Sequence, residues 1–176
     1  YGLVSREELE DLKSRMEDVD IKRAQEIERE IKHDLMAEVK VYAEQCPVGG
    51  GKVHLGATSY DIEDNANALC FLKALDIILT RVVNCLYHFS EKIEKYKRLP
   101  CMGWTHLQPA EPTTLGYRLA NYAQDLVLDV MVVERMKEVI GRGKGIKGAV
   151  GTSNSFKLLL KGRGSPSEPV SYTHLR

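Results

Sequence analysis

The sequence lacks the features that mark membrane, secreted or nucleic-acid-binding proteins. Among 176 residues, 25 Lys and Arg balance 25 Asp and Glu, so no basic surplus is available to bind polyanions. No apolar run approaches the ~20 residues that span a bilayer, and the longest, Leu126 to Val133, is interrupted by Asp129. With 43% hydrophobic and 28% charged residues, the composition is that of an ordinary globular protein. We therefore expect no nucleic-acid partner and no membrane partner.

Cysteine usage gives no sign of a metal site or of a disulfide framework. The four cysteines, Cys46, Cys70, Cys85 and Cys101, form no C-x-x-C pair, and no signal peptide opens the sequence. Reduced thiols in a cytoplasmic protein are the simplest interpretation. We expect no bound metal.

Both ends of the sequence suggest an internal fragment. No initiator Met precedes Tyr1, and glycines and prolines crowd residues 162–169, where they preclude regular structure. The last stretch, Pro169 to Arg176, resembles translated cloning or adapter DNA. We therefore expect residues 161–176 to be a disordered, non-native tail, and His174 is left out of the functional argument.

The first part of the chain predicts two helices. Residues 6–17 are strongly charged and predict a short, solvated helix, with Asp11 and Arg15 at the i,i+4 spacing of an ion pair. From residue 21 to about residue 42, apolar side chains recur every three or four positions and predict one amphipathic helix. Pro and clustered Gly at residues 46–51 end it. On such a helix His33 lies half a turn from the apolar stripe, so it is either simply exposed or faces a cleft. The stripe consists of Ile27, Ile31, Leu35, Val39 and Tyr42.

Two long heptad seams follow. The first consists of Leu72, Leu75, Leu79, Val82, Leu86, Phe89, Ile93 and Tyr96, with alternate spacings of three and four. If residues 62–96 form one helix, its length is roughly 50 Å at ~1.5 Å per residue, so it needs another long helix beside it. The second seam, which is broken once by Asp129, consists of Leu115, Leu119, Tyr122, Leu126, Asp129, Val133, Met136 and Ile140.

The helix that carries the second seam has apolar residues nearly all round near its middle, which is typical of a helix buried from several directions. Two helices cannot cover it, so missing helices or other subunits must complete the bundle. Strands are hard to place anywhere. The sequence therefore predicts an all-α, long-helix bundle that is incomplete in this chain. We divide it into an N-terminal helical region that runs into the first long helix, residues 1–103, and a part of the central bundle, residues 104–160.

Three polar segments interrupt the helices and are candidates for chemistry. In residues 54–61, Thr58 and Asp61 approximate a capping box at a helix end that can hold an anion, although a plain cap is the simpler interpretation. In residues 103–114, two prolines place His106 on an extended loop before a helix that starts near Thr113, where it is either a general acid or a hydrogen-bonded loop residue. Residues 141–156 combine five glycines with three cations, which suits either an anion site or a flexible linker.

Taken together, these segments resemble the adenylosuccinate lyases, a family of the fumarase/aspartase superfamily. Order and spacing agree over roughly residues 21–156. Argininosuccinate lyases and fumarases share the Thr-His-Leu-Gln core, but their first loop differs. The matching text is KHDLMA from Lys32, HLGATSYDIEDN from His54, WTHLQPAEPTTLG from Trp104, then Arg118 and Gln124-Asp125-Leu126, and KGAVGT from Lys147.

The resemblance implies a homotetramer built around very long helices, with active sites assembled from three subunits. It implies β-elimination of fumarate from adenylosuccinate, giving AMP, and from SAICAR, giving AICAR, in purine biosynthesis. It implies small-molecule substrates and no metal or organic cofactor. Such an elimination needs a base, an acid and donors that hold the developing enolate-like charge.

The resemblance also implies roles for individual residues. His106 is the general acid, and His33 is a second active-site histidine that supports it or binds phosphate. The resemblance assigns substrate binding to Thr58, Ser59, Thr105, Gln108 and Asp34, and the first three hold the succinyl carboxylates while Gln108 is a weaker candidate. His54 belongs to the match without a firm role. Many relatives carry Gln where Ser153 stands, which leaves substrate contact there in doubt.

Two departures from the family pattern limit what this chain can do. The serine-bearing Ser-Ser-x-Met-Pro-x-Lys-x-Asn-Pro signature, which carries the family's base, does not occur, and neither does the Ser-Arg-Tyr-like phosphate segment. We therefore expect the polypeptide as given to show no lyase activity. The alternatives are another superfamily lyase, such as an argininosuccinate lyase or a carboxymuconate cycloisomerase-like protein, and a catalytically silent helical oligomerisation module.

Overall fold

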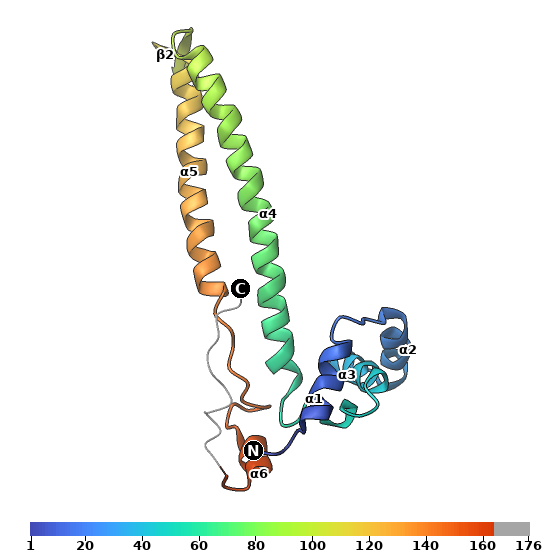
Figure 1. Ribbon diagram of the computed structural model, residues 1–176. Coiled ribbons are helices and arrows are strands. Elements are labelled where there is room, and N and C mark those ends of the chain that lie inside the picture. Colours follow the sequence, from blue (N-terminus) through green and yellow to red (C-terminus); the bar gives the residue numbers. More distant parts are fainter. Residues whose placement is uncertain (164–176) are drawn as a thin grey trace. The chain divides into compact units, whose positions relative to one another are not determined.

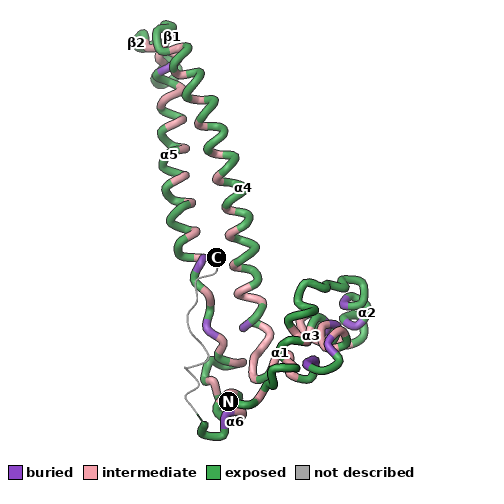
Figure 2. The backbone as a smooth tube through the Cα atoms, in the orientation of Figure 1, coloured by how far each residue is buried: buried purple, intermediate pink, exposed green. Residues whose placement is uncertain are grey.

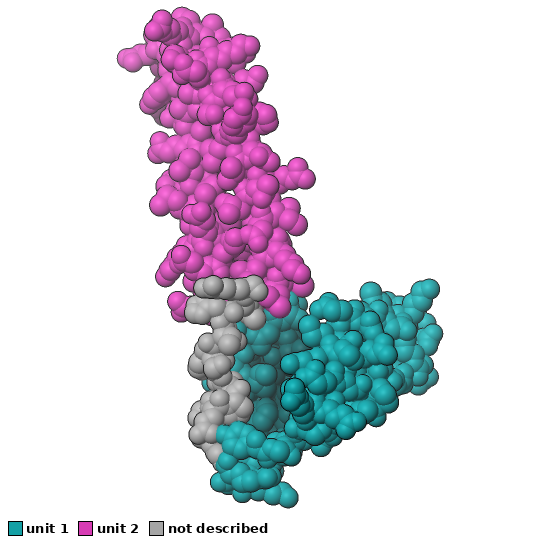
Figure 3. All heavy atoms as spheres, in the orientation of Figure 1, with its two compact units in different colours: residues 1–67, 143–173 teal, residues 68–142, 174–176 magenta. Residues whose placement is uncertain are grey.

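The computed structural model describes residues 1–163, so most of the expected tail lies outside the described residues. The chain divides into two compact units (Figure 3). The first joins Tyr1–Asn67 to the segment that begins at Gly143, and the second contains Ala68–Arg142. The domain boundary expected at residue 103 falls inside the second unit and stays a prediction for the intact protein.

Short helices build the first unit (Figure 1): α1 (Arg6–Arg15), α2 (Ile21–Ile31), α3 (Asp34–Gln45) and the 3-10 turn η1 (Gly50–Lys52). α1 opens with a capping box, in which Glu8 N donates to Ser5 Oγ and Ser5 N donates to Glu8 Oε2. It buries none of its residues, which confirms the predicted solvated helix. The core lies between α2 and α3 (Figure 2) and consists of Ala24, Ile27, Ala37 and Val41.

The single helix predicted over residues 21–42 is wrong, because the chain breaks it in the middle. Lys32 adopts a left-handed conformation (φ 54°), and its N–H donates to Glu28 O at 2.8 Å, which closes α2. α3 then begins with His33 as its N-terminal cap. Only Ile27 and Ile31 of the predicted stripe belong to this core, and α3 contributes Ala37 and Val41 to it instead of the predicted residues. The other stripe members are half-buried: Leu35, Val39 and Tyr42.

The predicted pair between Asp11 and Arg15 is also wrong, because each side chain has another partner. Asp11 Oδ2 accepts hydrogen bonds from Val48 N (2.9 Å) and Gly49 N (2.8 Å). Arg15 pairs with Asp18 at 3.1 Å. The Asp11 carboxylate thus ties α1 to the turn that follows α3.

One unbroken helix, α4 (Ser59–Tyr96), contains 38 residues and runs from the first unit into the second. All eight positions of the first predicted seam are half-buried, and every residue between them is exposed, which confirms the seam. The outer faces of α4 stay apolar: Ile77 is 63% exposed and Phe71 is 59% exposed. Its partner in the second unit therefore covers only one side of it.

That partner is α5 (Leu115–Ile140), which lies antiparallel to the second-unit part of α4 (Figures 1 and 2). The contacts between α4 and α5 differ at the two ends of the helix pair. The Lys137 ammonium pairs with Asp76, and the start of α5 lies against the end of α4 at Gly116. A β-carbon added to Gly116 would lie 2.6 Å from Lys97 Cα, so only glycine allows this approach.

The second predicted seam is right at five positions and wrong at three. Tyr122, Asp129 and Met136 are exposed. The half-buried positions are instead the residues that follow them, Ala123, Val130 and Lys137. α5 is thus rotated relative to the predicted orientation, and the rotation has a physical reason. It places the small side chain of Ala123 on the inner face. It also lets the carbon stem of Lys137 lie along α4 while its ammonium reaches the Asp76 carboxylate.

A hairpin joins α4 to α5, although no strand was predicted. β1 (Pro100–Thr105) pairs antiparallel with β2 (Gln108–Thr114), with Thr105 opposite Gln108. Pro109 and Pro112 fit in β2 because a two-stranded sheet has free edges, where a missing N–H breaks no ladder. The other described elements are helical, and the predicted all-α class is confirmed.

A side-chain cap marks the start of α5. Thr114 accepts a hydrogen bond from Tyr117 N at 3.2 Å, so α5 starts within two residues of the predicted position at Thr113. α6 (Asn154–Leu160) is the last described element and buries Leu160 in the first unit. Over residues 1–163, no helix combines the length and the apolarity that crossing a membrane requires.

Replacing Gly116 with Ala tests the close approach of α4 and α5. In an open helix position this change stabilises a protein by about 1 kcal/mol, because alanine has the higher helix propensity. At Gly116 the added methyl group meets the backbone of Lys97 and Ile93. We expect the opposite sign, a loss of about 2 kcal/mol in the free energy of unfolding, measured by urea titration.

The control is Gly51→Ala, because a β-carbon at Gly51 meets no atom within 4 Å and its φ is not left-handed. That variant should unfold at nearly the wild-type urea concentration. A Gly116→Ala chain that is as stable as wild type would show that the helices are farther apart than described.

Candidate active site

His33 and Ser59 come together in the first unit, although they are 26 positions apart in the sequence. His33 Nε2 lies 3.4 Å from Ser59 Oγ. Both residues stand at the N-terminal ends of helices, α3 and α4, where the backbone carries partial positive charge. The His33 side chain is 44% exposed. Two predicted site residues are therefore in hydrogen-bonding reach of each other and open to a ligand.

The other imidazole nitrogen of His33 faces its own helix. His33 Nδ1 accepts a hydrogen bond from Met36 N (3.4 Å), as an N-terminal cap does. Asp34 Oδ1 lies 3.4 Å from the same nitrogen and also accepts from Leu35 N at 2.8 Å. His33 is thus oriented from both sides of its ring, which the helical-wheel interpretation missed because it assumed an unbroken helix.

A buried carboxylate holds the residue before Ser59. Thr58 N donates to Asp61 Oδ2 at 3.0 Å, which is one half of the predicted capping box. Asp61 is 2% exposed and also accepts from Lys147 N (3.2 Å) and Gly148 N (2.9 Å). Burial alone raises the pKa of Asp61, but the three backbone N–H donors, with the Lys144 cation nearby, outweigh burial and lower it.

The glycine-rich segment does surround an anion, but that anion is the Asp61 carboxylate of the same chain. Asn65 adds a two-way bridge, because Lys144 N donates to its Oδ1 (2.8 Å) and its Nδ2 donates to Lys144 O (3.1 Å). The Lys144 ammonium pairs with Asp64, which raises the pKa of Lys144. Sequence reasoning missed Asp64 and Asn65, whose spacing of three and four from Asp61 on a helix was the available signal.

The second cluster lies on the hairpin of the second unit. His106 and Leu107 form its two-residue turn, and both have left-handed backbone conformations (φ 49° and 63°). Such turns usually take Asn or Gly, because other residues pay a steric cost there. Thr105 and Gln108 flank the turn as a pair, and all four residues are exposed. The imidazole is therefore presented outward on a short, defined turn.

The predicted residues thus fall into two clusters, one in each compact unit. The structure brings together His33, Asp34, Thr58 and Ser59 in the first, and Thr105, His106 and Gln108 in the second. Ser153 has a left-handed backbone and precedes α6 without a side-chain capping bond. Over residues 1–163, no group of three or more His, Cys, Asp or Glu side chains is arranged to hold a metal ion.

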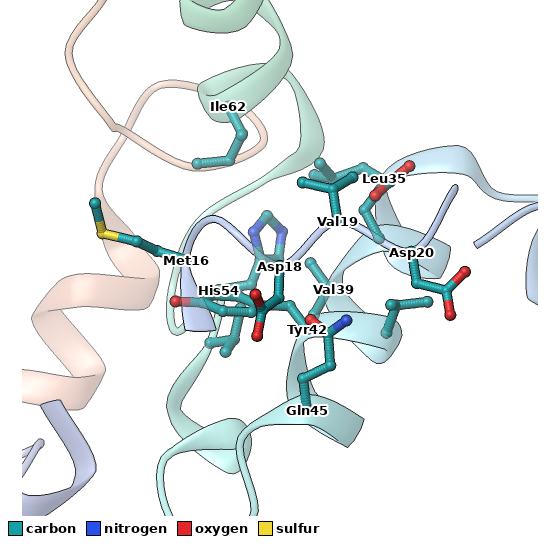
Figure 4. Close-up of a pocket in the computed structure, with 13 residues that line it drawn as sticks. Met16, Asp18, Val19, Asp20, Leu35, Val39, Tyr42, Gln45, His54 and Ile62 are labelled. Carbon is teal, nitrogen blue, oxygen red and sulfur yellow. The ribbon is translucent and has the colours of Figure 1, made fainter. Parts of the chain in front are cut away.

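A cavity of about 340 Å³ lies in the first unit, and none of the residues of the two clusters lines it (Figure 4). His54 and Tyr42 line it, and so does Gln45, whose buried Oε1 accepts no hydrogen bond from the described residues. Its remaining polar lining is acidic, from Asp18, Asp20 and Glu38. Three carboxylates repel a phosphate-bearing ligand, so the cavity does not suit the site that the sequence predicts.

Asp61→Asn tests whether the carboxylate organises the loop and the start of α4. The amide side chain keeps the size but places an NH2 group against backbone N–H donors. We expect a loss of about 2 kcal/mol in the free energy of unfolding at neutral pH. In amide hydrogen exchange, Lys147 and Gly148 N–H should lose protection.

The pH dependence has a defined sign. Because folding lowers the pKa of Asp61, its contribution is present above the unfolded value of about 3.9 and is lost as the pH falls through the folded pKa. The difference in stability between wild type and Asp61→Asn should therefore shrink below about pH 4. Asp129→Asn, on an exposed part of α5, is the control and should behave as wild type. Equal stability of the Asp61 variant and wild type at pH 7 would contradict the role of this carboxylate.

Comparison with known proteins places the chain among lyases. A protein-family model described as "Lyase" matches residues 6–158. The adenylosuccinate lyase of Schistosoma mansoni is 40% identical over 159 residues, which cover 90% of this chain and 33% of that protein. The adenylosuccinate lyase of Saccharomyces cerevisiae is 40% identical over 162 residues, 91% of this chain and 33% of that protein. The chain spans about a third of the length of the curated relatives it matches.

Solved structures share the fold. The fumarate lyase from Mesorhizobium sp. BNC1 has a TM-score of 0.83 at 22% identity, over 96% of this chain and 39% of that one. The 3-carboxy-cis,cis-muconate lactonizing enzyme from Pseudomonas putida has a TM-score of 0.77 at 25% identity, over 88% of this chain and 36% of that one. The predicted long-helix architecture of the fumarase/aspartase type is thereby confirmed.

Proposed function

The chain belongs to the lyase family of the fumarase/aspartase superfamily, and from this premise we propose that it is part of an adenylosuccinate lyase. The proposed reaction is β-elimination of fumarate from adenylosuccinate, giving AMP, and from SAICAR, giving AICAR. Adenylosuccinate lyases at about 40% identity over most of the chain support the substrate class. We expect a cytoplasmic, cofactor-independent carbon–nitrogen lyase that contributes to purine biosynthesis.

The observation that carries this proposal is that the two histidines of the matched motifs, His33 and His106, are exposed and yet held in defined positions. A histidine that served only as a surface residue would not need to be held in one orientation. Here His33 is oriented through both ring nitrogens, and His106 is held on a strained turn. A helical oligomerisation module has no use for either arrangement.

Each cluster supplies a different part of the elimination. His106 is proposed to protonate the departing nitrogen as general acid, because its imidazole is exposed on a defined turn. Thr58, Ser59 and Thr105 are proposed to hold the succinyl carboxylates with hydroxyl donors. His33 is proposed as the second active-site histidine, with Asp34 beside it. Gln108 is a further binding candidate, since it is paired with Thr105 across the hairpin.

We further propose that a complete site uses both clusters from different copies of the chain, in a homotetramer. Their separation into two compact units, with most of α4 between them in the sequence, supports this arrangement. The outer faces of the long helices offer the apolar surface that such an assembly buries. On α5 these exposed side chains include Leu128, Met131, Val132 and Val139.

His106→Gln in the intact lyase tests the acid role. Glutamine keeps a polar group on the hairpin turn but cannot deliver a proton. We expect kcat for adenylosuccinate to fall by about 10²–10⁴, with little change in KM, measured by the ultraviolet absorbance change on fumarate release.

His88→Gln is the matched control, because His88 lies exposed on α4 and its ring contacts are with Glu91 and Tyr87. It should leave both kinetic constants near wild type. If kcat and substrate affinity fell equally in the His106 variant, His106 would be a binding residue and not the acid. An intact protein that cleaves argininosuccinate and leaves adenylosuccinate unchanged would overturn the proposed substrate.

A further inference from the structure

Two groups make opposite demands on the same nitrogen of His33. Met36 N–H lies 3.4 Å from Nδ1 and needs a lone pair there. The Asp34 carboxylate also lies 3.4 Å from Nδ1 and favours a proton there. A neutral imidazole carries one proton, so satisfying one of these groups at Nδ1 decides the state of Nε2, the nitrogen that faces Ser59.

We propose that the Met36 amide holds neutral His33 with its proton on Nε2, so that His33 donates to Ser59 Oγ. Asp34 competes weakly, because its side chain is 72% exposed to water and its Oδ1 already accepts from Leu35 N at 2.8 Å. The Met36 N–H, in contrast, belongs to the first turn of α3 and has no carbonyl partner within that helix. Capping therefore selects the tautomer.

This tautomer determines what Ser59 can bind. A hydroxyl has one proton and two lone pairs. Since Ser59 Oγ accepts the proton of His33 Nε2, its own proton is available to a ligand oxygen, and the matching group is a carboxylate. The opposite tautomer would take the Ser59 proton and turn the oxygen into an acceptor that repels a carboxylate. His33 is thus a positioning residue for Ser59, an inference that rests on the proposed function.

The tautomer can be read directly by long-range 1H–15N correlation on the chain labelled at histidine, at mildly alkaline pH. His33 should show its proton on Nε2 and a bare Nδ1. His88 is the internal reference, because its Nδ1 lies 3.2 Å from Glu91 Oε2 and should carry the proton instead. The His33 signals are assigned by their loss in His33→Gln. A protonated Nδ1 on neutral His33 overturns the inference, whatever the enzyme's activity.

Two variants of the intact lyase separate the cap from the contact with Ser59. In His33→Asn, the side-chain oxygen replaces Nδ1 and keeps the cap, but nothing replaces Nε2. In His33→Gln, the amide nitrogen approximates Nε2 and the cap is lost. We expect His33→Asn to keep its melting temperature while KM rises about tenfold. We expect His33→Gln to melt about 3 °C lower, with a smaller rise in KM.

The outcomes are distinguishable. If His33→Asn kept both the wild-type melting temperature and the wild-type KM, His33 would be a structural cap alone, and the inference would be wrong. If neither variant changed any kinetic constant, the proposed function at this cluster would fail, while the tautomer measurement would still decide which group controls Nδ1.

Discussion

The buried Asp61 carboxylate is the contact on which the first unit depends. It lies in the first turn of α4 and accepts backbone N–H bonds from Thr58 before the helix and from Lys147 and Gly148 far along the chain. One ionised group thereby determines where α4 starts and where the glycine-rich segment runs. Because Ser59 follows Thr58 directly, the same contact places the hydroxyl that meets His33. The structural carboxylate and the proposed binding cluster therefore share one helix end.

The long helices impose a different constraint, because they bury only one stripe each within the chain. α4 and α5 meet along half-buried seams, while large apolar side chains such as Ile77 and Met131 remain more than half exposed. Exposed apolar surface of this extent is typical of a face that packs against another protein surface. This exposed apolar surface supports the proposal that residues of the two units serve one site in different copies of the chain.

The spacing of apolar residues predicted the buried face of a helix only where the buried residues are large and apolar. The α4 seam could be read correctly because every member is a large apolar residue, whereas α5 offered Tyr122 and Met136 beside the true inner residues Ala123 and Lys137, and size misled the assignment. The break at Lys32 carries no Gly or Pro signal, since it is made by one left-handed residue. The motifs predicted His33, Ser59 and His106 as site residues, but contacts such as Asp61 with Lys147 join distant segments, and spacing alone cannot reveal them.

Complementation between two impaired variants of the intact lyase tests the central claim most directly, that one site combines the His33 cluster of one copy with the His106 hairpin of another. His33→Asn and His106→Gln proteins are unfolded together, refolded as a mixture and assayed for fumarate release at a substrate concentration well below KM, with each variant refolded alone as the control. The account predicts that the mixture is more active than the mean of the two separate variants, because mixed assemblies contain some sites in which both histidines are intact. A mixture that only matches that mean, although mixed assemblies form, would contradict it.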